Sequence, residues 1–190
     1  LIIVFLGMTV AYLTTRRKSL LTDIIDTLTM FPYIIPGSVL GITLLLAFNE
    51  EPLLLSGTAL IIIISLVIRR LPYTLRSSSA ILYQISPSIE EASISLGASP
   101  LKTFFKVTAV MMLPGVMSAA ILSWITAINE LSSSVILFTG ATKTMSVAIY
   151  TEVIRASYGT AAALSTILTL TTIAAMLIFF RVSGSRDVTL

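Results

Sequence analysis

The feature that most constrains this chain is its long apolar runs, which are bunched together rather than spaced at helical or strand intervals. Only 11% of the 190 residues are charged, whereas soluble domains carry about 25%. A run of about 20 apolar residues is long enough to cross the hydrocarbon core of a bilayer as a helix. We therefore expect an all-α membrane protein with several spans, forming a single domain over residues 1–190.

Five apolar runs are candidates for membrane spans. The predicted spans cover residues 1–13, 33–48, 53–68, 107–128 and 161–180. The first is shorter than the ~20 residues that a span requires, and it lacks the basic region and cleavage site of a signal peptide. We therefore expect the chain to begin part-way through a span. Residues 20–30, which include Asp23 and Asp26, indicate an amphipathic helix at the membrane interface.

The basic residues set the predicted orientation of these spans. An alternation of five spans places most of them on one side, namely Arg16, Arg17, Lys18, Arg69, Arg70, Arg76, Lys102, Lys106, Arg181 and Arg186. Only Lys143 and Arg155 fall on the other side. Because loops rich in Lys and Arg face the cytoplasm, the first side is predicted to be cytoplasmic. In this scheme Arg69 and Arg70 end the third span on the cytoplasmic side, and Glu130 follows the fourth span on the outer side.

A polar connection, residues 71–111, joins the third and fourth predicted spans on the cytoplasmic side. Its helix-start signals are Ser86-Pro87, Ser88 with Glu91 as a capping box, and Ser99-Pro100. Gly97 is placed to end the first helix, because glycine tolerates the left-handed backbone found there. The connection is therefore predicted to form a helix, a glycine turn and a second helix. From composition alone, an interfacial hairpin in which Glu91 caps its own helix accounts for the same pattern.

The run from Glu91 to Pro114 resembles the cytoplasmic signature loop of ABC-importer permeases. That pattern is Glu-Ala-Ala, three residues, Gly, then nine residues and an aliphatic residue, followed closely by Leu-Pro. The matching residues are Glu91, Ala92, Gly97 and Val107. Ser93 replaces the second alanine, and Val110 stands where the proline of Leu-Pro usually falls.

The resemblance implies a membrane helical bundle of the ABC-importer permease type, whose cytoplasmic loop contains a coupling helix. In such importers the loop docks on a separate cytoplasmic ABC ATPase, which holds ATP and Mg²⁺. The residues that the resemblance assigns to coupling are Glu91, Ala92, Ser93, Leu96 and Gly97. Leu96 would anchor in an apolar pocket of the ATPase, and Glu91 would pair with a basic residue there. This chain itself would bind no cofactor and catalyse no reaction, and it contains no phosphate-binding loop of the ATPase type.

Further segments are similar to the ferric-iron branch of that family. They are Pro36-Gly37, Asn129-Glu130-Leu131-Ser132, the run 146–150, and Tyr158-Gly159 through Leu164. Ferric-iron permeases are commonly two tandem halves, and this sequence resembles a C-terminal half. The implied substrate is ferric iron. The implied partners are a periplasmic or lipid-anchored substrate-binding protein and a second permease half or copy, in the bacterial cytoplasmic (inner) membrane.

Four residues are candidates for the translocation pathway or its gate, namely Asn129, Glu130, Pro36 and Gly37. Ionisable groups at membrane depth are costly and suggest function, and irregular backbone is tolerated where it lines a cavity. Two simpler interpretations remain open. Glu130 would cost little in the outer interface, and Pro36-Gly37 would be an ordinary start of a helix.

An outer amphipathic helix is predicted over residues 146–156, where a binding protein would dock. Glu152 and Arg155 on this helix are equally consistent with a solvated charge pair. Met111 and Met112 are assigned to packing.

Several classes of function are disfavoured by composition. The chain has no cysteine and no histidine, which removes thiolate metal sites and the usual general base. No catalytic or metal-binding residues are therefore predicted, and no basic face indicates nucleic-acid binding. Within the importer class, sulfate or molybdate, thiamine, polyamine and phosphonate are alternative solutes. A secondary transporter would show ionisable pairs within spans and repeat symmetry, neither of which is evident in the sequence. A membrane scaffold subunit is the third alternative.

Overall fold

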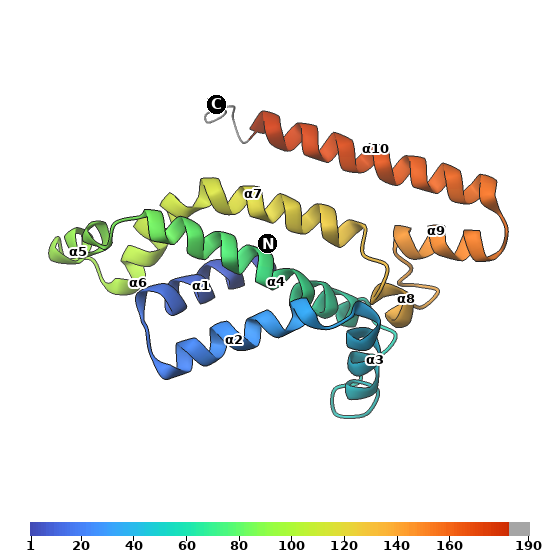
Figure 1. The fold of residues 1–190 in the computed structure, drawn as a ribbon, viewed down its shortest axis with the longest axis horizontal. Coiled ribbons are helices and arrows are strands. Elements are labelled where there is room, and N and C mark those ends of the chain that lie inside the picture. Colours follow the sequence, from blue (N-terminus) through green and yellow to red (C-terminus); the bar gives the residue numbers. More distant parts are fainter. Residues whose placement is uncertain (183–190) are drawn as a thin grey trace. The chain divides into compact units, whose positions relative to one another are not determined.

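The computed structural model describes residues 1–182, and all the secondary structure in that part of the chain is helical (Figure 1). The elements are α1 (Ile2–Arg16), α2 (Leu20–Ile34), α3 (Gly37–Ala47), α4 (Ala59–Gln84), α5 (Pro87–Ser95), α6 (Pro100–Thr103), the π-helical turn η1 (Phe104–Thr108), α7 (Ala109–Ile128), α8 (Ser134–Leu137), α9 (Met145–Ile154) and α10 (Tyr158–Val182). The expected all-helical architecture is thereby confirmed. Arg186, one of the basic residues used for the predicted orientation, lies outside the described residues.

The chain divides into two compact units. The first contains Leu1–Phe31 and Arg70–Ser123, and the second contains Pro32–Arg69 and the chain from Trp124 onward. Three helices, α2, α4 and α7, therefore contribute residues to both units. The predicted coupling loop belongs to the first unit, and the predicted pathway residues belong to the second.

The first unit is held together by an apolar cluster from α1, α4 and α7. Its buried members are Met8, Leu82, Ile85, Met112 and Val116. Close approach of the helices depends on glycine at two contacts. A Cβ on Gly7 would lie 2.7 Å from Thr74 Cγ2, and one on Gly115 would lie 2.5 Å from Ile81 Cδ1. Small residues of this kind let membrane helices pack backbone against side chain.

The second unit has its own apolar cluster, formed by α3, α4 and α8. Its buried members are Leu40, Leu44, Ile61, Ile62 and Leu137. Gly41 lies at this contact, because a Cβ there would be 3.1 Å from Ile136 Cβ. The short helices α3 and α8 are thus packed on the N-terminal part of α4, close to the break between α2 and α3.

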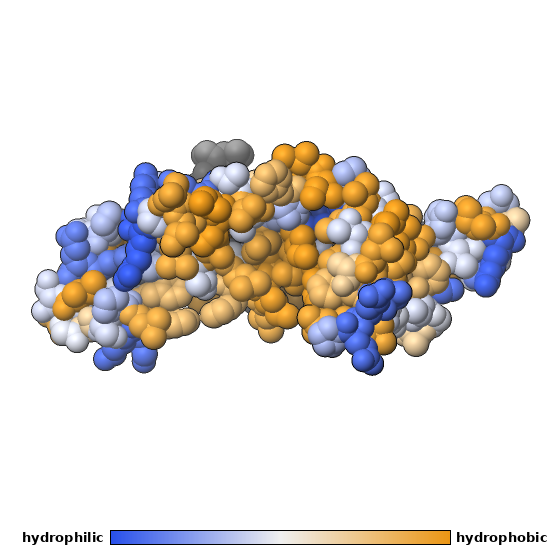
Figure 2. All heavy atoms as spheres, turned by 90° about the horizontal axis from the view of Figure 1, so that it is seen from below, coloured by the Kyte–Doolittle hydropathy of each residue, from blue (hydrophilic) through white to orange (hydrophobic). Residues whose placement is uncertain are grey.

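Within the described residues, two helical segments are long and apolar enough to cross a membrane. They are Pro100–Ile128, with 29 residues, and Tyr158–Arg181, with 24 residues. A third candidate is the pair Leu20–Ile34 and Gly37–Ala47, which together are apolar enough but are bent by 111° at their junction. Large apolar side chains on these helices are exposed, and orange hydrophobic residues cover much of the face in Figure 2. Such exposure is expected where lipid rather than water is the solvent.

The predicted fourth and fifth spans, 107–128 and 161–180, are confirmed as helices. The fourth extends further toward its N-terminus, through the π-helical turn to Pro100. The amphipathic stretch 20–30 is also helical, as the first part of α2. The count of five spans stays a prediction.

Two predicted spans are wrong in their boundaries. Residues 33–48 do not form one helix, because Pro36 cannot donate a backbone hydrogen bond and the chain turns sharply between α2 and α3. The stretch 53–68 begins as a loop, and the helix there runs from Ala59 to Gln84. Arg69 and Arg70 therefore do not end this helix. The side chain of Arg69 is half-buried and that of Arg70 is buried, so neither needs to lie at a membrane edge.

Candidate functional site

The start of α5 is capped by Ser86. Its side chain accepts a hydrogen bond from the backbone N–H of Ser88 at 3.4 Å, and Pro87 occupies the first helical position. The predicted capping box of Ser88 with Glu91 is therefore wrong. Proline has no N–H to satisfy and a φ suited to a helix, so the helix begins at Pro87 and its cap is the preceding residue.

The predicted glycine turn is confirmed. Gly97 has a φ of +89°, and the backbone N–H of Ala98 donates to the carbonyl of Ser93 at 3.1 Å. This left-handed closure favours glycine, because a side chain would be strained there. Ser99 then caps α6 by accepting from the N–H of Lys102 at 3.3 Å. The loop is therefore two short helices that meet at a bend at Gly97.

Most of the predicted coupling residues lie on the surface of this loop. Glu91, Ala92 and Gly97 are exposed, and Leu96 is 90% exposed. Ser93 is half-buried, and its hydroxyl lies 3.0 Å from that of Thr103. Ser93 thus joins α5 to α6, while its neighbours form an accessible patch, called the loop patch below, that consists of Glu91, Ala92, Leu96 and Gly97.

Glu90 is the residue in this loop that sequence reasoning missed. Its carboxylate is paired with Arg16 of α1 at 3.0 Å and accepts a hydrogen bond from Tyr12 at 3.1 Å. Arg16 also donates to the carbonyls of Leu82 and Ile85 at 3.3 and 2.6 Å. One arginine thus fixes α5, the C-terminal end of α4 and α1 to one another. The adjacent acids Glu90 and Glu91 look alike in the sequence, and only helical phase separates the buried one from the exposed one.

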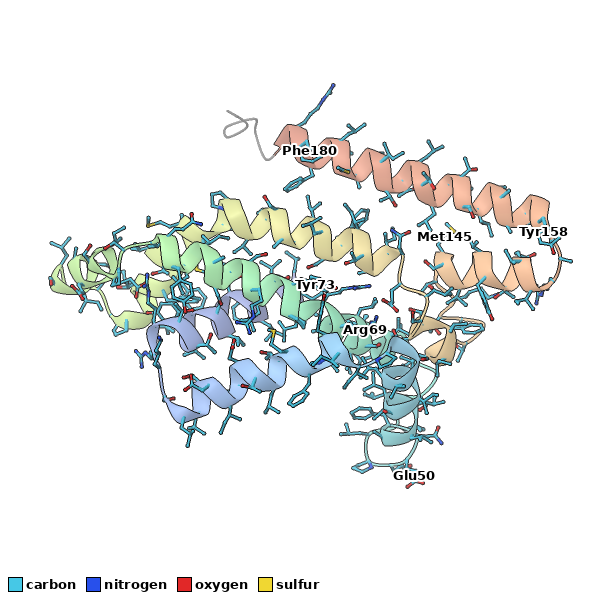
Figure 3. All side chains as sticks on the ribbon, in the orientation of Figure 1. Glu50, Arg69, Tyr73, Met145, Tyr158 and Phe180 are labelled. Carbon is cyan, nitrogen blue, oxygen red and sulfur yellow. The ribbon has the colours of Figure 1, made fainter. Side chains whose placement is uncertain are left out.

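A second polar cluster surrounds the junction of α2 and α3. Arg69 extends from α4 toward this junction (Figure 3). Its Nε lies 3.3 Å from Glu130 Oε2, and its Nη1 donates to the carbonyl of Ile35 at 3.4 Å. The Arg69 and Glu130 side chains are 18% and 4% exposed. Glu130 also accepts from the backbone N–H of Ser133 at 3.3 Å.

Gly37 fits tightly into the same cluster. A Cβ at this position would lie 2.6 Å from Ser132 Cβ and 2.8 Å from Arg69 Nη1. Pro36 precedes it with φ −56° and ψ 139° and is the N-cap residue of α3. Two of the predicted pathway positions, Gly37 and Glu130, are thus brought together around Arg69, which the sequence analysis assigned to the end of a span and not to the pathway.

Asn129, the remaining pathway candidate, does not join this cluster through its side chain. Its Nδ2 donates to the carbonyl of Ile125 at 2.8 Å, and the residue is exposed. This bond closes the last turn of α7. The pathway role of Asn129 stays a prediction.

The Arg69–Glu130 contact corrects the predicted orientation. The alternation of five spans separates these two residues across a hydrocarbon core about 30 Å thick, whereas the structure places them 3.3 Å apart. At least one of the two assignments is wrong. An arginine with a carboxylate partner need not reach the cytoplasmic water, so its position in the sequence is not by itself evidence for the end of a span. The structure also contains a buried ionisable pair, Arg69–Glu130, which was not evident in the sequence.

The predicted outer helix is present as α9, residues Met145–Ile154. It is capped by Thr144, which accepts from the N–H of Val147 at 3.4 Å. Glu152 and Arg155 form an ion pair of 3.3 Å in which the arginine side chain is 65% exposed. This geometry is that of a solvated helical pair, which contributes little to stability.

Metal ligands do not gather in the part of the chain that is described. Within residues 1–182, no three His, Cys, Asp or Glu side chains come together in a group able to hold a metal ion. The absence of a resident cofactor stays a prediction.

Comparison with known proteins decides the family. A family model described as "Binding-protein-dependent transport system inner membrane component" matches residues 3–186. The chain belongs to this family. This permease is therefore a membrane protein of a transport system, and its relatives are not enzymes but permeases.

The relatives of this permease include ferric transport proteins. It is 35% identical over 182 residues to the ferric transport system permease protein FbpB of Actinobacillus pleuropneumoniae, covering 96% of this chain and 26% of that protein. It is 36% identical over 139 residues to the putative ferric transport system permease protein FbpB 1 of Haemophilus influenzae, covering 73% and 22%. The predicted resemblance to a ferric-type ABC-importer permease is thereby confirmed. This chain spans about a quarter of the length of these ferric relatives.

Permeases named for another solute also match. The putative 2-aminoethylphosphonate transport system permease protein PhnV of Salmonella typhimurium is 31% identical over 152 residues, which is 80% of this chain and 57% of that protein. Relatives named for different solutes therefore match this chain.

Proposed function

We propose that this chain is a transmembrane subunit of an ATP-driven importer and that its α5–α6 loop docks on a separate cytoplasmic ATPase. One observation carries the proposal. The loop is fixed to the helical bundle through the Glu90–Arg16 pair, yet it leaves Leu96 90% exposed. A large apolar side chain held in place on a rigid turn suits a contact with another protein.

The connection from the loop into the membrane supports the coupling role. The loop leads through α6 and the π-helical turn into α7, and the segment Pro100–Ile128 is long and apolar enough to span the bilayer. A displacement of the loop by a closing ATPase would therefore act on a helix rather than on a flexible chain. ATP and Mg²⁺ are held by the ATPase in this proposal, and the present chain supplies no catalytic group.

The loop patch offers complementary chemistry for that contact. Leu96 would fill an apolar pocket, and Glu91 would pair with a basic side chain of the ATPase. A few buried anchors usually carry most of the energy of an interface. Gly97 keeps the bend between α5 and α6, which sets the direction in which Leu96 points.

The proposed substrate is ferric iron, on the ground that the ferric relatives share 35–36% identity with this chain. A phosphonate is the second candidate, since the aminoethylphosphonate permease matches at 31% identity. The residues proposed to line or gate the pathway are Asn129, Glu130, Pro36 and Gly37.

The proposed partners follow from the family's name and from the exposed helices. A substrate-binding protein, periplasmic or lipid-anchored, would dock near α9, and a second permease half or copy would complete the pathway. The proposed location is the bacterial cytoplasmic (inner) membrane, crossed several times.

The test is uptake by the intact importer in cells that lack the chromosomal copy. Glu91→Lys and Gly97→Asp are expected to abolish uptake of radioactive ferric iron while the protein still inserts in the membrane. Glu50→Lys and Gly140→Asp are matched controls, because Glu50 is an exposed acid outside the loop sequence and a Cβ on Gly140 would meet nothing within 4 Å. Normal uptake by both loop variants would refute the coupling role. Uptake of a phosphonate instead of iron would reassign the substrate.

A further inference from the structure

The Arg69–Glu130 pair lies between two stretches of backbone that are not helical. Ile35 and Pro36 separate α2 from α3, with a bend of 111°, and Glu130 belongs to the short link between α7 and α8. Such links reorient without breaking a helix, as hinge segments do. Because Arg69 contacts both Ile35 and Glu130, its ion pair restrains these two links together.

Two polar groups of this cluster, one on Arg69 and one on Ser133, are satisfied poorly for so buried a site. Arg69 Nε lies within 3.3 Å of the carboxylate but its N–H does not align with any acceptor, and its Nη1 contact is 3.4 Å long. The hydroxyl of Ser133, a residue that is 0% exposed, has no hydrogen-bond partner. Buried polar groups are normally paired, and exceptions mark stored strain or function.

The Arg16–Glu90 pair is a comparison in which the arginine is held by hydrogen bonds. Its Nε–Oε1 distance is 3.0 Å with an aligned hydrogen bond, and Arg16 also donates to a carbonyl at 2.6 Å. The two pairs have the same chemistry and similar burial. They differ in how well the arginine is held, which makes the Arg69 pair the easier of the two to open.

We propose that Arg69 is a positioning residue of the transport pathway, whose ion pair with Glu130 closes the α2–α3 junction against the α7–α8 link in one transport state and opens in another. This inference rests on the proposed function. Opening would release Gly37 from its contact with Arg69 and uncover the Ser133 hydroxyl.

This chain contributes no cysteine of its own, so single cysteines placed in it can be labelled in the complete importer once cysteines of the other parts are replaced. Ser133→Cys is nearly isosteric and places one thiol beside the pair. Its reaction with a small water-soluble methanethiosulfonate is measured in membranes with and without ATP and the binding protein. The expected result is a labelling rate that differs between these conditions. Arg69→Gln or Glu130→Gln is expected to raise the rate roughly tenfold or more and to remove that difference, since breaking a buried pair strongly favours the open form.

Two controls separate the possible results. Asn129→Cys, at an exposed position, must label in every condition and shows that reagent reaches this region. Arg76→Gln removes an arginine of the same helix that pairs with Asp26 and is 55% exposed, and it should leave Ser133→Cys labelling unchanged. Equal labelling of Ser133→Cys in all conditions, whether fast or slow, would overturn the proposal, as would glutamine variants that leave its rate unaltered.

Failure of the proposed function is detected at a different position. Leu96→Cys should lose its reactivity when the ATPase binds. If Leu96→Cys stays reactive, the docking assignment is wrong, whereas the Ser133→Cys rates report on the ion pair itself.

Discussion

Arg16 and Arg69 both follow apolar runs in the sequence, and each reaches a glutamate in the fold. Arg16 holds Glu90 and two carbonyls at the end of α4, whereas Arg69 holds Glu130 beside a helix break. Their roles differ because their surroundings differ, not their chemistry. The first fixes the loop to the bundle, and the second lies among groups that are incompletely paired.

Glu90→Gln should destabilise the protein, because it leaves Arg16 without a charged partner in a site where both side chains are nearly buried. The expected loss is about 1–3 kcal/mol, below the full cost of breaking a buried pair because some solvent reaches the site. Thermal unfolding in detergent measures it. Glu91→Gln is the matched control and should unfold as the unaltered protein does, since Glu91 is exposed. Equal unfolding temperatures for the two variants would contradict the assignment of Glu90 as the anchor.

At the scale of elements, the pattern of apolar runs predicts helices well and predicts their ends poorly. The stretch 161–180 is found within α10 because nothing interrupts it. The stretch 33–48 fails because Pro36-Gly37 starts a new helix inside it, as the simpler interpretation of these two residues had it, instead of continuing one span. The stretch 53–68 fails because Arg69 and Arg70 resemble a stop, and only the fold shows the carboxylate that Arg69 meets. Local composition does not reveal which residues far apart in the sequence are in contact.

Gly37→Val should disrupt the α2–α3 junction, because even the first carbon of a side chain would lie 2.6 Å from Ser132. Overpacking of this kind costs about 1–3 kcal/mol. Gly159→Val is the control, since a Cβ there would meet nothing within 4 Å. The measurement is the unfolding temperature in detergent. If the two variants lose stability equally, Gly37 is not held against Ser132 and Arg69.

Met111 and Met112 provide a second element-scale comparison. The sequence predicts packing for both, but Met112 is 0% exposed within the first unit's apolar cluster and Met111 is 43% exposed. Met112→Ala should therefore cost about 2–5 kcal/mol, and Met111→Ala much less. Unfolding of the two variants in the same detergent checks this order. A larger loss for Met111→Ala would show that the assigned face of α7 is wrong.

At the scale of the whole molecule, the coupling loop was the most predictable part of the candidate site. Its cap residues, its glycine and its pattern of small residues are local signals, and the structure confirms the turn at Gly97. The pathway cluster was only half predictable, because Gly37 and Glu130 attract attention individually while Arg69 connects them. The family match then accounts for the exposed apolar helices as parts of a membrane protein.

The central proposal is that this chain transmits the action of an ATPase through the α5–α6 loop. Its most direct test is co-purification of the ATPase with the complete permease from detergent-solubilised membranes. We expect the ATPase to be recovered with the unaltered protein and with Gly140→Asp, and to be lost with Gly97→Asp and with Leu96→Ser. Equal recovery of the ATPase with all four proteins would contradict the account.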